Sequence, residues 1–353
     1  MPASTSTEVA EHTPENRSEL VLVFDAQDAN PNGNPLSPSN KPRIDPVTQQ
    51  AIVTDVRIKR YIRDQLTEDG HGVYIANVKT EDGNAPPREY LAERVAAVDS
   101  AADIDDGFLD EFLANAVDVR YFGATLAFDT KSNEIADAIS EHLPQHLTGP
   151  VQLSPARSLN AVRENQSYNS LTSVIGTGEG KEQGGFQLDD HRIVYGLFGM
   201  SGVINENNAA NTNLSEADVQ RLDSLWWRSI KNQANSRSKR GQHPRLYVRV
   251  EYDSGFHIGN LDRTLRLGDL SKPEEELTDV NDTALDIRPF VDRLAAASDR
   301  IDTLHVASDP VLTIEDNGTE LTSKLGEYLR SELGVAVREV DIHTEMHDTF
   351  PAE

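Results

Sequence analysis

Lys59, Arg60 and Arg63 are the side chains of this sequence whose spacing first suggests a chemistry, the binding of a polyanion. They stand at positions i, i+1 and i+4 of a segment whose apolar residues recur with the period of a helix. On such a helix the three cations form a stripe that can follow the phosphates of a nucleic acid. The alternative is a solvated helix face on which Asp55 or Asp64 pairs with these bases, worth roughly a few tenths of a kcal/mol.

The first part of the loop before this helix, residues 30–44, carries no carboxylate. Five prolines and one glycine lie between Pro31 and Pro46, and they keep the loop out of a helix. Asp25 and Asp28, at the end of the preceding strand, are the nearest candidates for a metal-binding pair that cleaves a phosphodiester. Residues 30–44 contain no acid, and an amide serves neither as a general base nor as an anionic metal ligand. The pattern favours a protein that binds a polyanion without cutting it.

Two further patterns are poor candidates for sites. The run Gly-Thr-Gly-Glu-Gly-Lys at 176–181 is similar to a phosphate-binding loop, but Glu182 follows the lysine and the first glycine is missing. A flexible hairpin is the better interpretation. His142 and His146 are four residues apart, but Pro144 separates them and no third metal ligand is evident. The absence of cysteine excludes a disulfide framework and a thiolate zinc site.

The composition is strongly acidic, with 59 Asp and Glu against 33 Lys and Arg, only nine lysines and a formal net charge of −26. Such a balance is typical of proteins that stay hydrated in concentrated salt, so we expect an extreme halophile as the source; an ordinary acidic cytosolic protein is the alternative. No apolar run approaches 18 residues and no apolar signal region follows Met1, which predicts a soluble, cytoplasmic protein without a membrane partner. Residues 1–18 are polar and are expected to form a disordered tail.

The bases are concentrated in two islands. Residues 226–250 hold seven bases and no acid, and residues 41–64 hold six bases and three acids. Residues 251–353, in contrast, hold 24 acids and nine bases. Basic islands in an acidic protein indicate a polyanion site. The alternative is that these arginines pair with acids from the C-terminal third.

The apolar patterns predict a mixed α+β fold. Helices are expected at 54–66 with Thr54 as N-cap, 88–98, 108–116, 133–142, from Ser215 in a capping box with Asp218, and at 321–333 before Gly334. Strands are expected at 20–25, 71–79, 117–126, 149–159, 186–197, 246–252, 304–307 and 335–342. Residues 81–87 form an expected turn, 160–185 a long loop and 259–286 an irregular stretch. The order fits a ferredoxin-like sheet interrupted by large insertions.

Five ordered blocks between residues 20 and 252 carry a resemblance to a known family. They are the Asn-Pro-Asn-Gly and Pro-Arg-Ile-Asp motifs with the Thr-Asp-Val-Arg-Ile-Lys-Arg-Tyr-Ile-Arg helix (30–63), Asp-Val-Arg-Tyr-Phe-Gly-Ala (118–124), Gly-Pro-Val-Gln with Arg157-Ser158 (149–158), Asp-His-Arg-Ile-Val-Tyr-Gly (190–196), and Trp226-Trp227 followed by Arg-Ser-Lys-Arg-Gly (237–241). In order and spacing they resemble the Cas seven family, the backbone subunit of CRISPR Cascade complexes, in its type I-B branch. Many relatives carry an acid after Asn-Pro-Asn-Gly, where this chain has Asn34.

The resemblance implies a ferredoxin-like, RNA-recognition-type palm with finger and thumb insertions. Residues 19–353 then form a single RNA-binding domain, with fingers at about 77–118 and a thumb at about 155–200. The implied partners are a CRISPR guide RNA, further copies of the chain polymerised along it, other Cascade subunits, and target DNA through the guide heteroduplex. No cofactor and no metal are implied. The implied RNA contacts are Asn32, Arg43, Arg57, Lys59, Arg60, Arg63, Arg157, Arg237, Lys239 and Arg240, with a bridge to a neighbouring copy as the alternative for Arg57.

The resemblance also raises an enzymatic alternative. Related backbone subunits of type III complexes cut target RNA with an aspartate in the loop after the first strand. The comparable position here falls near Ser39 and Asn40, so we expect a structural protein and no enzyme. A metal-dependent ribonuclease of the type III kind and a globular protein with purely structural basic islands remain the alternatives.

Overall fold

The computed structural model describes residues 13–37, 40–79, 86, 88–128, 134–165, 167–168, 170–174, 184–233, 237–268, 270 and 272–342. Residues 1–12 of the expected tail, Ser39, most of the expected turn at 81–87 and the glycine-rich run 176–181 lie outside the described residues. In the described part of the tail, Arg17 pairs with Glu206 at 2.8 Å, and Ser18 already belongs to a strand. The ordered domain therefore begins slightly before residue 19.

Helices and strands alternate along the chain, which confirms the mixed α+β class. The strands are β1 Ser18–Ala29, β2 Ile52–Val53, β3 Gly123–Thr125, β4 His146–Thr148, β5 Val151–Leu153, β6 Ala156–Ser158, β7 Glu164–Asn165, β8 Ser170–Val174, β9 Gly184–Leu188, β10 Arg192–Ile204, β11 Gln242–Tyr252, β12 Arg266–Leu267, β13 Ala284–Asp286, β14 Ile301–Ser308, β15 Thr313–Asp316, β16 Thr319–Glu320 and β17 Ala336–Glu339. The α-helices are α1 Asp55–Glu68, α2 Arg88–Ala96, α3 Phe108–Asn115, α4 Val117–Phe122, α5 Glu134–His142, α6 Glu206–Ala209, α7 Glu216–Lys231, α8 Arg288–Ala295 and α9 Leu325–Leu333. Across the described part of the chain, no helix combines the length and apolar character needed to span a bilayer.

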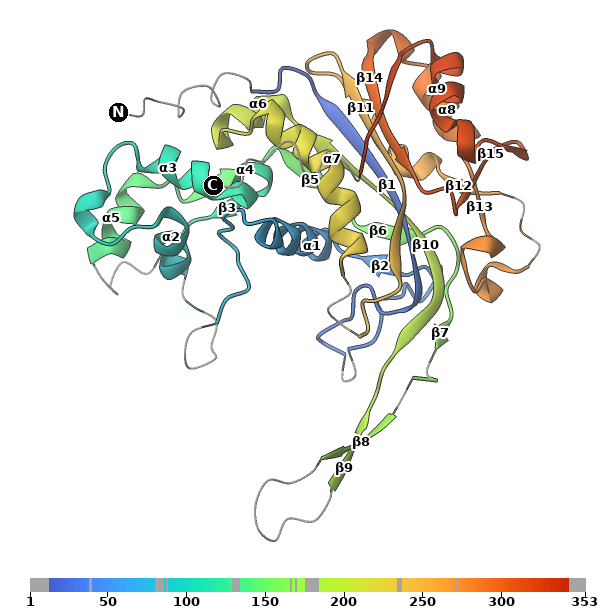
Figure 1. The fold of residues 1–353 in the computed structure, drawn as a ribbon, viewed down its shortest axis with the longest axis horizontal. Helices are drawn as coiled ribbons and strands as arrows, with labels where there is room; N and C mark the ends of the chain where they lie inside the picture. Colours follow the sequence, from blue (N-terminus) through green and yellow to red (C-terminus); the bar gives the residue numbers. More distant parts are fainter. Residues whose placement is uncertain are drawn as a thin grey trace.

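A large sheet with the strand order β17-β14-β11-β1-β10-β6-β2 lies at the centre of the molecule (Figure 1). β1 pairs antiparallel with both β10 and β11, β11 pairs antiparallel with β14, and β14 pairs parallel with β17. The strand expected at 149–159 is split into β5 and β6, which both pair with β10. Pro155 lies at the break, where it supplies no N–H for the ladder.

The two faces of β1 are both buried. Leu20, Leu22 and Phe24 point into the core on one face, while Val21 and Val23 point into the core on the other. This explains why the strand is an uninterrupted apolar run in the sequence and does not alternate with polar residues.

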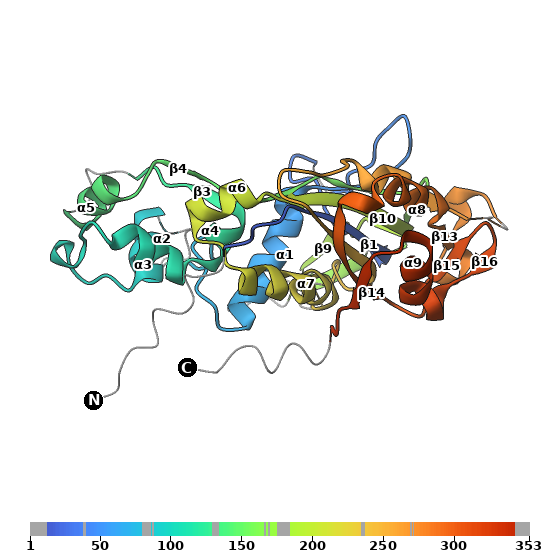
Figure 2. The ribbon, with the colours of Figure 1, turned by 90° about the horizontal axis from the view of Figure 1, so that it is seen from above.

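Helices α1 and α7 cover the first face of the sheet, side by side (Figures 1 and 2). The Thr54 hydroxyl accepts from the N–H of Arg57 and begins α1, as predicted. Ser215 and Asp218 form the predicted capping box of α7. The apolar residues of both helices lie in the same core as Leu20, Leu22 and Phe24 of β1, so the apolar face of each helix packs against the sheet.

The C-terminal region covers the second face of the sheet. Helices α8 and α9 and the small sheet β12-β13-β15-β16 pack there (Figure 1). The irregular stretch expected at 259–286 contains β12, β13 and short 3-10 helices. This region buries Tyr195, Leu197 and Val248 of the central strands and so covers the second face of the sheet at these residues.

Residues 71–148 form a separate lobe with its own core, to one side of the sheet (Figures 1 and 2). The helices α2, α3 and α5 are those that the sequence predicts. The strand expected at 71–79 is wrong: the N–H groups of Tyr74 and Ile75 donate to the carboxylate of Asp118 at 2.7 and 3.2 Å, and to no neighbouring strand. The side-chain acceptor replaces a β ladder.

The extended segment expected at 117–126 is also wrong, because most of it is the helix α4. Val117, Val119, Tyr121 and Phe122 are all buried, so this short helix is apolar on several sides and has no helical period to detect. Arg120 donates to the carbonyl oxygens of Leu113 and Ala114 at 2.7 and 2.8 Å and ties α4 to the end of α3.

A hairpin of β8 and β9 extends away from the sheet beyond β7 and β10 (Figure 1). The long loop expected at 160–185 therefore contains strands in its described part.

Candidate nucleic-acid interface

The loop after β1 is tightly held at residues 30–33. Tyr61 of α1 donates its hydroxyl to the Pro31 carbonyl oxygen at 2.7 Å, and the Asn30 side chain donates to the Asn40 carbonyl oxygen at 2.8 Å. A Cβ atom at Gly33 would lie 2.2 Å from the side chain of Asn40. A side chain at residue 33 would therefore displace the side chain of Asn40.

A turn at residues 237–241 lies against this loop. The N–H of Asn30 donates to the Ser238 carbonyl oxygen at 2.7 Å, and the N–H of Gln27 donates to the Gly241 carbonyl oxygen at 2.9 Å. Gly241 has φ of 105°, and a Cβ atom there would lie 2.3 Å from the Gln27 carbonyl oxygen. Two segments far apart in the sequence are thereby fixed side by side.

Arg57 and Lys239 meet where the loop and the turn join α1. The Lys239 ammonium donates to the Asn30 carbonyl oxygen, and the Arg57 guanidinium lies 5.9 Å from the centre of the Tyr61 ring. Burial, and then the charge of Arg57, lower the pKa of Lys239 from 10.5 to about 8. No carboxylate among the described residues forms an ion pair with either side chain. Two neighbouring cations without a counter-charge are a candidate site for an anion.

Asn32 and Arg43, two of the predicted RNA contacts, belong to this loop, and both are at least partly buried. Asn32 is only 5% exposed, and its side-chain oxygen accepts from the N–H and the hydroxyl of Thr54 at 2.8 and 2.9 Å. The N–H of Arg43 donates to the Asn32 carbonyl oxygen at 3.3 Å. The Nε atom of Arg43 is buried and has no hydrogen-bond partner within the described residues.

The predicted stripe on α1 is already paired with carboxylates. Lys59 lies 3.3 Å from Asp55 and Arg60 lies 2.8 Å from Asp64, both at the i,i+4 spacing considered as the alternative. Both pairs are partly exposed, with the Lys59 side chain 16% and the Arg60 side chain 27% exposed, and partly exposed ion pairs of this spacing contribute little to stability, so a phosphate can compete for the bases.

Arg63 faces the helical lobe and not solvent. Its Nε donates at 2.8 Å to Asp118, a fully buried carboxylate that also accepts from the main chain of Tyr74 and Ile75. Arg63 thus joins α1 to the lobe formed by residues 71–148.

Arg157, Arg237 and Arg240 lie at the edges of the candidate interface. Arg157 is half exposed and lies 3.7 Å from Asp45. Arg237 is also half exposed and lies 3.4 Å from Asp190, which accepts two closer hydrogen bonds from Arg192. These hydrogen bonds outweigh burial and lower the pKa of Asp190. Arg240 is exposed.

Much of the basic island at 226–250 is structural. Three of its arginines form buried ion pairs: Arg228 with Asp69 at 2.6 Å, Arg245 with Asp25 at 2.8 Å and with Asp309, and Arg249 with Asp223 at 2.7 Å. These three arginines are therefore structural, as the alternative interpretation of the island expected. Most of their carboxylate partners, however, lie outside the C-terminal third of the chain. The turn at 237–241 is the part of the island left for a ligand.

The carboxylates considered for a metal pair are engaged elsewhere. Asp25 is buried against Arg245, and burial raises the pKa of Asp25 despite that positive charge. The Asp28 carboxylate accepts from the side chain of Asn165 at 3.0 Å. Among the described residues, no group of three or more His, Asp and Glu side chains is arranged to hold a metal ion.

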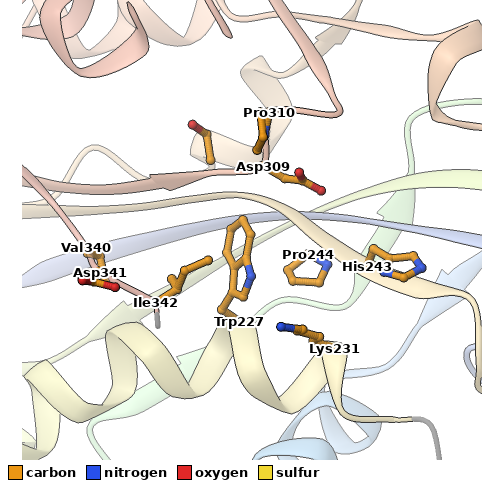
Figure 3. A pocket seen from close by; sticks show the side chains of 10 residues that line it. Trp227, Lys231, His243, Pro244, Asp309, Pro310, Val340, Asp341 and Ile342 are labelled. Atoms are coloured by element: carbon orange, nitrogen blue, oxygen red, sulfur yellow. The ribbon is translucent and has the colours of Figure 1, made fainter. Parts of the chain in front are cut away.

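A groove of about 440 Å³ lies between α7, the start of β11 and the residues that follow β14 and β17. Figure 3 shows the ring of Trp227 rising from α7 between Ile342 and Pro244, with Lys231 nearby. None of the predicted RNA contacts lines this groove, so it is separate from the site formed by Arg57 and Lys239.

Comparison with known proteins places the chain in a family. The family described as "CRISPR-associated protein Cas7" matches residues 16–288. A protein of Haloferax volcanii with the name "CRISPR-associated protein Cas7" is 50% identical over 339 residues, which are 94% of this chain and 98% of that protein. The chain belongs to the Cas7 family of CRISPR-associated proteins. The source of this relative agrees with the halophilic origin predicted from composition.

Chains of two solved structures, described as "CRISPR RNA-guided surveillance complex, pre-nicking" and "CRISPR RNA-guided surveillance complex", align with this chain. Their TM-scores are 0.45 and 0.44, with 11% and 13% sequence identity. The alignments cover 90% and 95% of this chain and 100% of each of those chains. Similarity at this level carries no argument about ligands.

The residues that assemble the site are less visible in the sequence than the cations themselves. Asn30, Tyr61 and Gln242 tie the loop, the helix and the turn together: Gln242 donates to the Lys239 carbonyl oxygen at 2.9 Å and lies beside the Tyr61 hydroxyl. Tyr61 looks like an ordinary core residue of an amphipathic helix, and no local pattern connects it with residue 242. The one clue in the sequence is that the hydroxyl of a buried tyrosine needs a hydrogen-bond partner.

Proposed function

We propose that this chain is the guide-RNA-binding backbone subunit of a type I-B CRISPR interference complex, Cascade. The observation that carries the proposal is the pair Arg57 and Lys239, two adjacent cations with no carboxylate partner among the described residues. Two adjacent cations repel one another, and Lys239 is also partly desolvated, so a bound anion stabilises the pair. Membership of the Cas7 family supports a CRISPR guide RNA as this anion.

In this proposal several copies polymerise along one guide RNA in the cytoplasm. Each copy holds a short segment of spacer and presents it for pairing with target DNA, while other Cascade subunits bind at the ends or along the filament. The protein contacts the RNA backbone, and base pairing supplies the sequence specificity.

The sheet serves as a ferredoxin-like palm. The strand order β11-β1-β10-β6 with α1 and α7 on one face supports this assignment. RNA-recognition domains stack bases on the open face of such a sheet, but here the C-terminal region covers that face. The RNA therefore lies at the end of the sheet, over the loop and the turn. Residues 77–118 serve as fingers and residues 155–200, with the hairpin β8–β9, as the thumb.

The proposed RNA contacts differ in role. Arg57 and Lys239 form the centre, with Arg43, Arg157, Arg237 and Arg240 around it. Lys59 and Arg60 reach phosphates by exchanging their surface carboxylates for them. Asn32 and Arg63 contribute through the hydrogen bonds that hold the loop and α1 in place.

The subunit acts without catalysis in this proposal. Residues 30–44 supply no acid, and the Asp25 carboxylate is paired with Arg245. Neither a general base nor an anionic metal ligand faces the RNA from this loop.

The test is the RNA content of the purified particle, measured by native mass spectrometry and nuclease protection. The double variant Arg57→Gln, Lys239→Met removes both charges without adding a carboxylate. Arg293→Gln, an exposed arginine on α8, is the matched control. We expect guide RNA in the wild type and in the control, and none in the double variant. Wild-type particles without RNA, or a double variant that protects RNA as well as the wild type, overturn the proposal.

A further inference from the structure

We propose that Asn32 is a positioning residue: its hydrogen bonds to Thr54 hold Arg57 and Lys239 at one site, and its side chain does not itself touch RNA. The inference rests on the proposed function and concerns how the anion site is built.

The side chain of Asn32 has little left to offer a ligand. It is 5% exposed, its Oδ1 accepts from the N–H and the hydroxyl of Thr54 at 2.8 and 2.9 Å, and its Nδ2 donates to the Gly33 carbonyl oxygen at 3.1 Å. Buried amides are ordinarily satisfied within the protein, and this one is satisfied by main chain and by one hydroxyl.

On one side, these hydrogen bonds lead to Arg57. Thr54 is the N-cap of α1, and its hydroxyl donates to Asn32 while accepting from the N–H of Arg57 at 3.3 Å. One hydroxyl therefore links the loop to the first turn of the helix. A shift of the loop moves the residue that carries the guanidinium.

On the other side, the same loop leads to Lys239. The Asn30 carbonyl oxygen accepts from the Lys239 ammonium, and the Asn30 N–H donates to Ser238. The order of contacts is thus Arg57, Thr54, Asn32, the main chain of residues 30–32, and Lys239. No ion pair within the described residues holds the two cations together.

The hydrogen bonds between Thr54, Asn32 and the loop matter because Arg57 and Lys239 repel one another. Like charges move apart when their supports loosen, and no acid of the described residues lies between them as a counter-charge. A phosphate that bridges both cations needs them at a fixed separation, so holding them in advance increases affinity. Asn32 provides that support from within the loop.

The experiment is a double-mutant cycle between Asn32 and Thr54, read as binding of a labelled single-stranded RNA at several KCl concentrations. The variants are Asn32→Ala, Thr54→Val and the two together, with Thr54→Ser as the control that keeps both donors. We expect about a tenfold drop in affinity for each single variant, no further drop for the double variant, and wild-type affinity for Thr54→Ser. We also expect a shallower salt dependence, by up to about 0.7 in log–log slope for each phosphate that the variant no longer neutralises.

The salt dependence separates positioning from direct contact. If Asn32 contacts a base or a ribose, Asn32→Ala weakens binding while the slope stays as in the wild type, and its effect adds to that of Thr54→Val. That result overturns the inference, as does unchanged binding in both single variants. Should Asn32→Ala fail to fold, Thr54→Val removes the hydroxyl hydrogen bond to Asn32 from the other side and leaves the main-chain one in place. A wild type that binds no RNA overturns the proposed function and is distinguishable from either outcome.

Discussion

Replacing Lys239 with methionine tests the anion site through protein stability, without RNA. In the folded protein the pKa of Lys239 is lowered from 10.5 to about 8, by burial first and by the charge of Arg57 second. At about 1.4 kcal/mol for each tenfold change in the ionisation constant, the charged form carries roughly 3 kcal/mol of unfavourable free energy. Partial exposure and concentrated salt reduce this value. Removal of the hydrogen bond to Asn30 subtracts roughly 1 kcal/mol more. We expect Lys239→Met to stabilise the RNA-free protein by about 1–2 kcal/mol at pH 7.

The lowered pKa of Lys239 determines how the stability difference between the wild type and Lys239→Met changes with pH. Between pH 8 and 10.5 the unfolded chain holds a proton that the folded Lys239 has released, so the wild type gains stability as the pH rises through this window. Below pH 8 the unfavourable charge is fully present. The advantage of the methionine variant is therefore largest at pH 7 and shrinks towards pH 10.

Urea unfolding in 2 M KCl at pH 7 and at pH 10 measures both effects. Lys231→Met, an exposed lysine of the same basic island, is the control and should change stability little at either pH. A Lys239→Met variant that is less stable than the wild type by the same amount at both pH values refutes the reasoning. It would show that Lys239 supports the fold and does not weaken it.

Four further outcomes are expected. Asp118→Asn leaves Arg63 facing a neutral group and lowers the free energy of unfolding by about 3–5 kcal/mol in urea titrations; a decrease below 1 kcal/mol contradicts the buried pair. Gly241→Ala forces a side chain into a left-handed backbone beside Gln27, costs about 1–3 kcal/mol and lowers the thermal midpoint; an unchanged midpoint speaks against this geometry. Complementary RNA bound to the particle stays intact with Mg²⁺ on a sequencing gel, and regular cuts that disappear on Asp28→Ala argue for the ribonuclease. Sedimentation should show the guide-bound filament intact at about 2 M KCl and dissociated in dilute buffer, because salt relieves repulsion between acidic copies while direct hydrogen bonds and stacking persist; release at 2 M opposes this account.

The parts of the fold that local patterns control were predictable. Thr54 and Ser215 begin their helices with side-chain oxygens placed for the first free N–H groups, and the apolar run at 20–25 could only be a buried strand or helix segment. The error at 117–126 arises because α4 is apolar on several sides and shows no helical period. The error at 71–79 arises from a distant acceptor, the carboxylate of Asp118. It accepts main-chain N–H groups from a distant segment and anchors Arg63, and no window of sequence around residue 74 contains it.

The sequence was enough to find the basic residues of the candidate site, but it was not enough to predict what each of them contacts. The bases at 57–63 and 237–240 were evident, and the i,i+4 acids that pair with Lys59 and Arg60 were evident too. The proximity of Arg57 to Lys239 was not, because it depends on the main chain of Asn30 and on the turn closed by Gly241. Sequence spacing describes neighbours along a helix, but it does not describe two loops that meet in space.

The position of β1 has a consequence for how the chain is made. β1 precedes the other described strands along the chain and lies at the centre of the sheet, but its partners begin only at Arg192 and Gln242. Until they are synthesised, the apolar run of β1 has two unpaired edges and two uncovered faces, which favours aggregation. Concentrated salt removes the electrostatic protection that the acidic surface gives in dilute buffer. The apolar run of β1 therefore stays exposed until β11 has emerged, and a chain that ends before Tyr252 lacks part of the strand that pairs with β1.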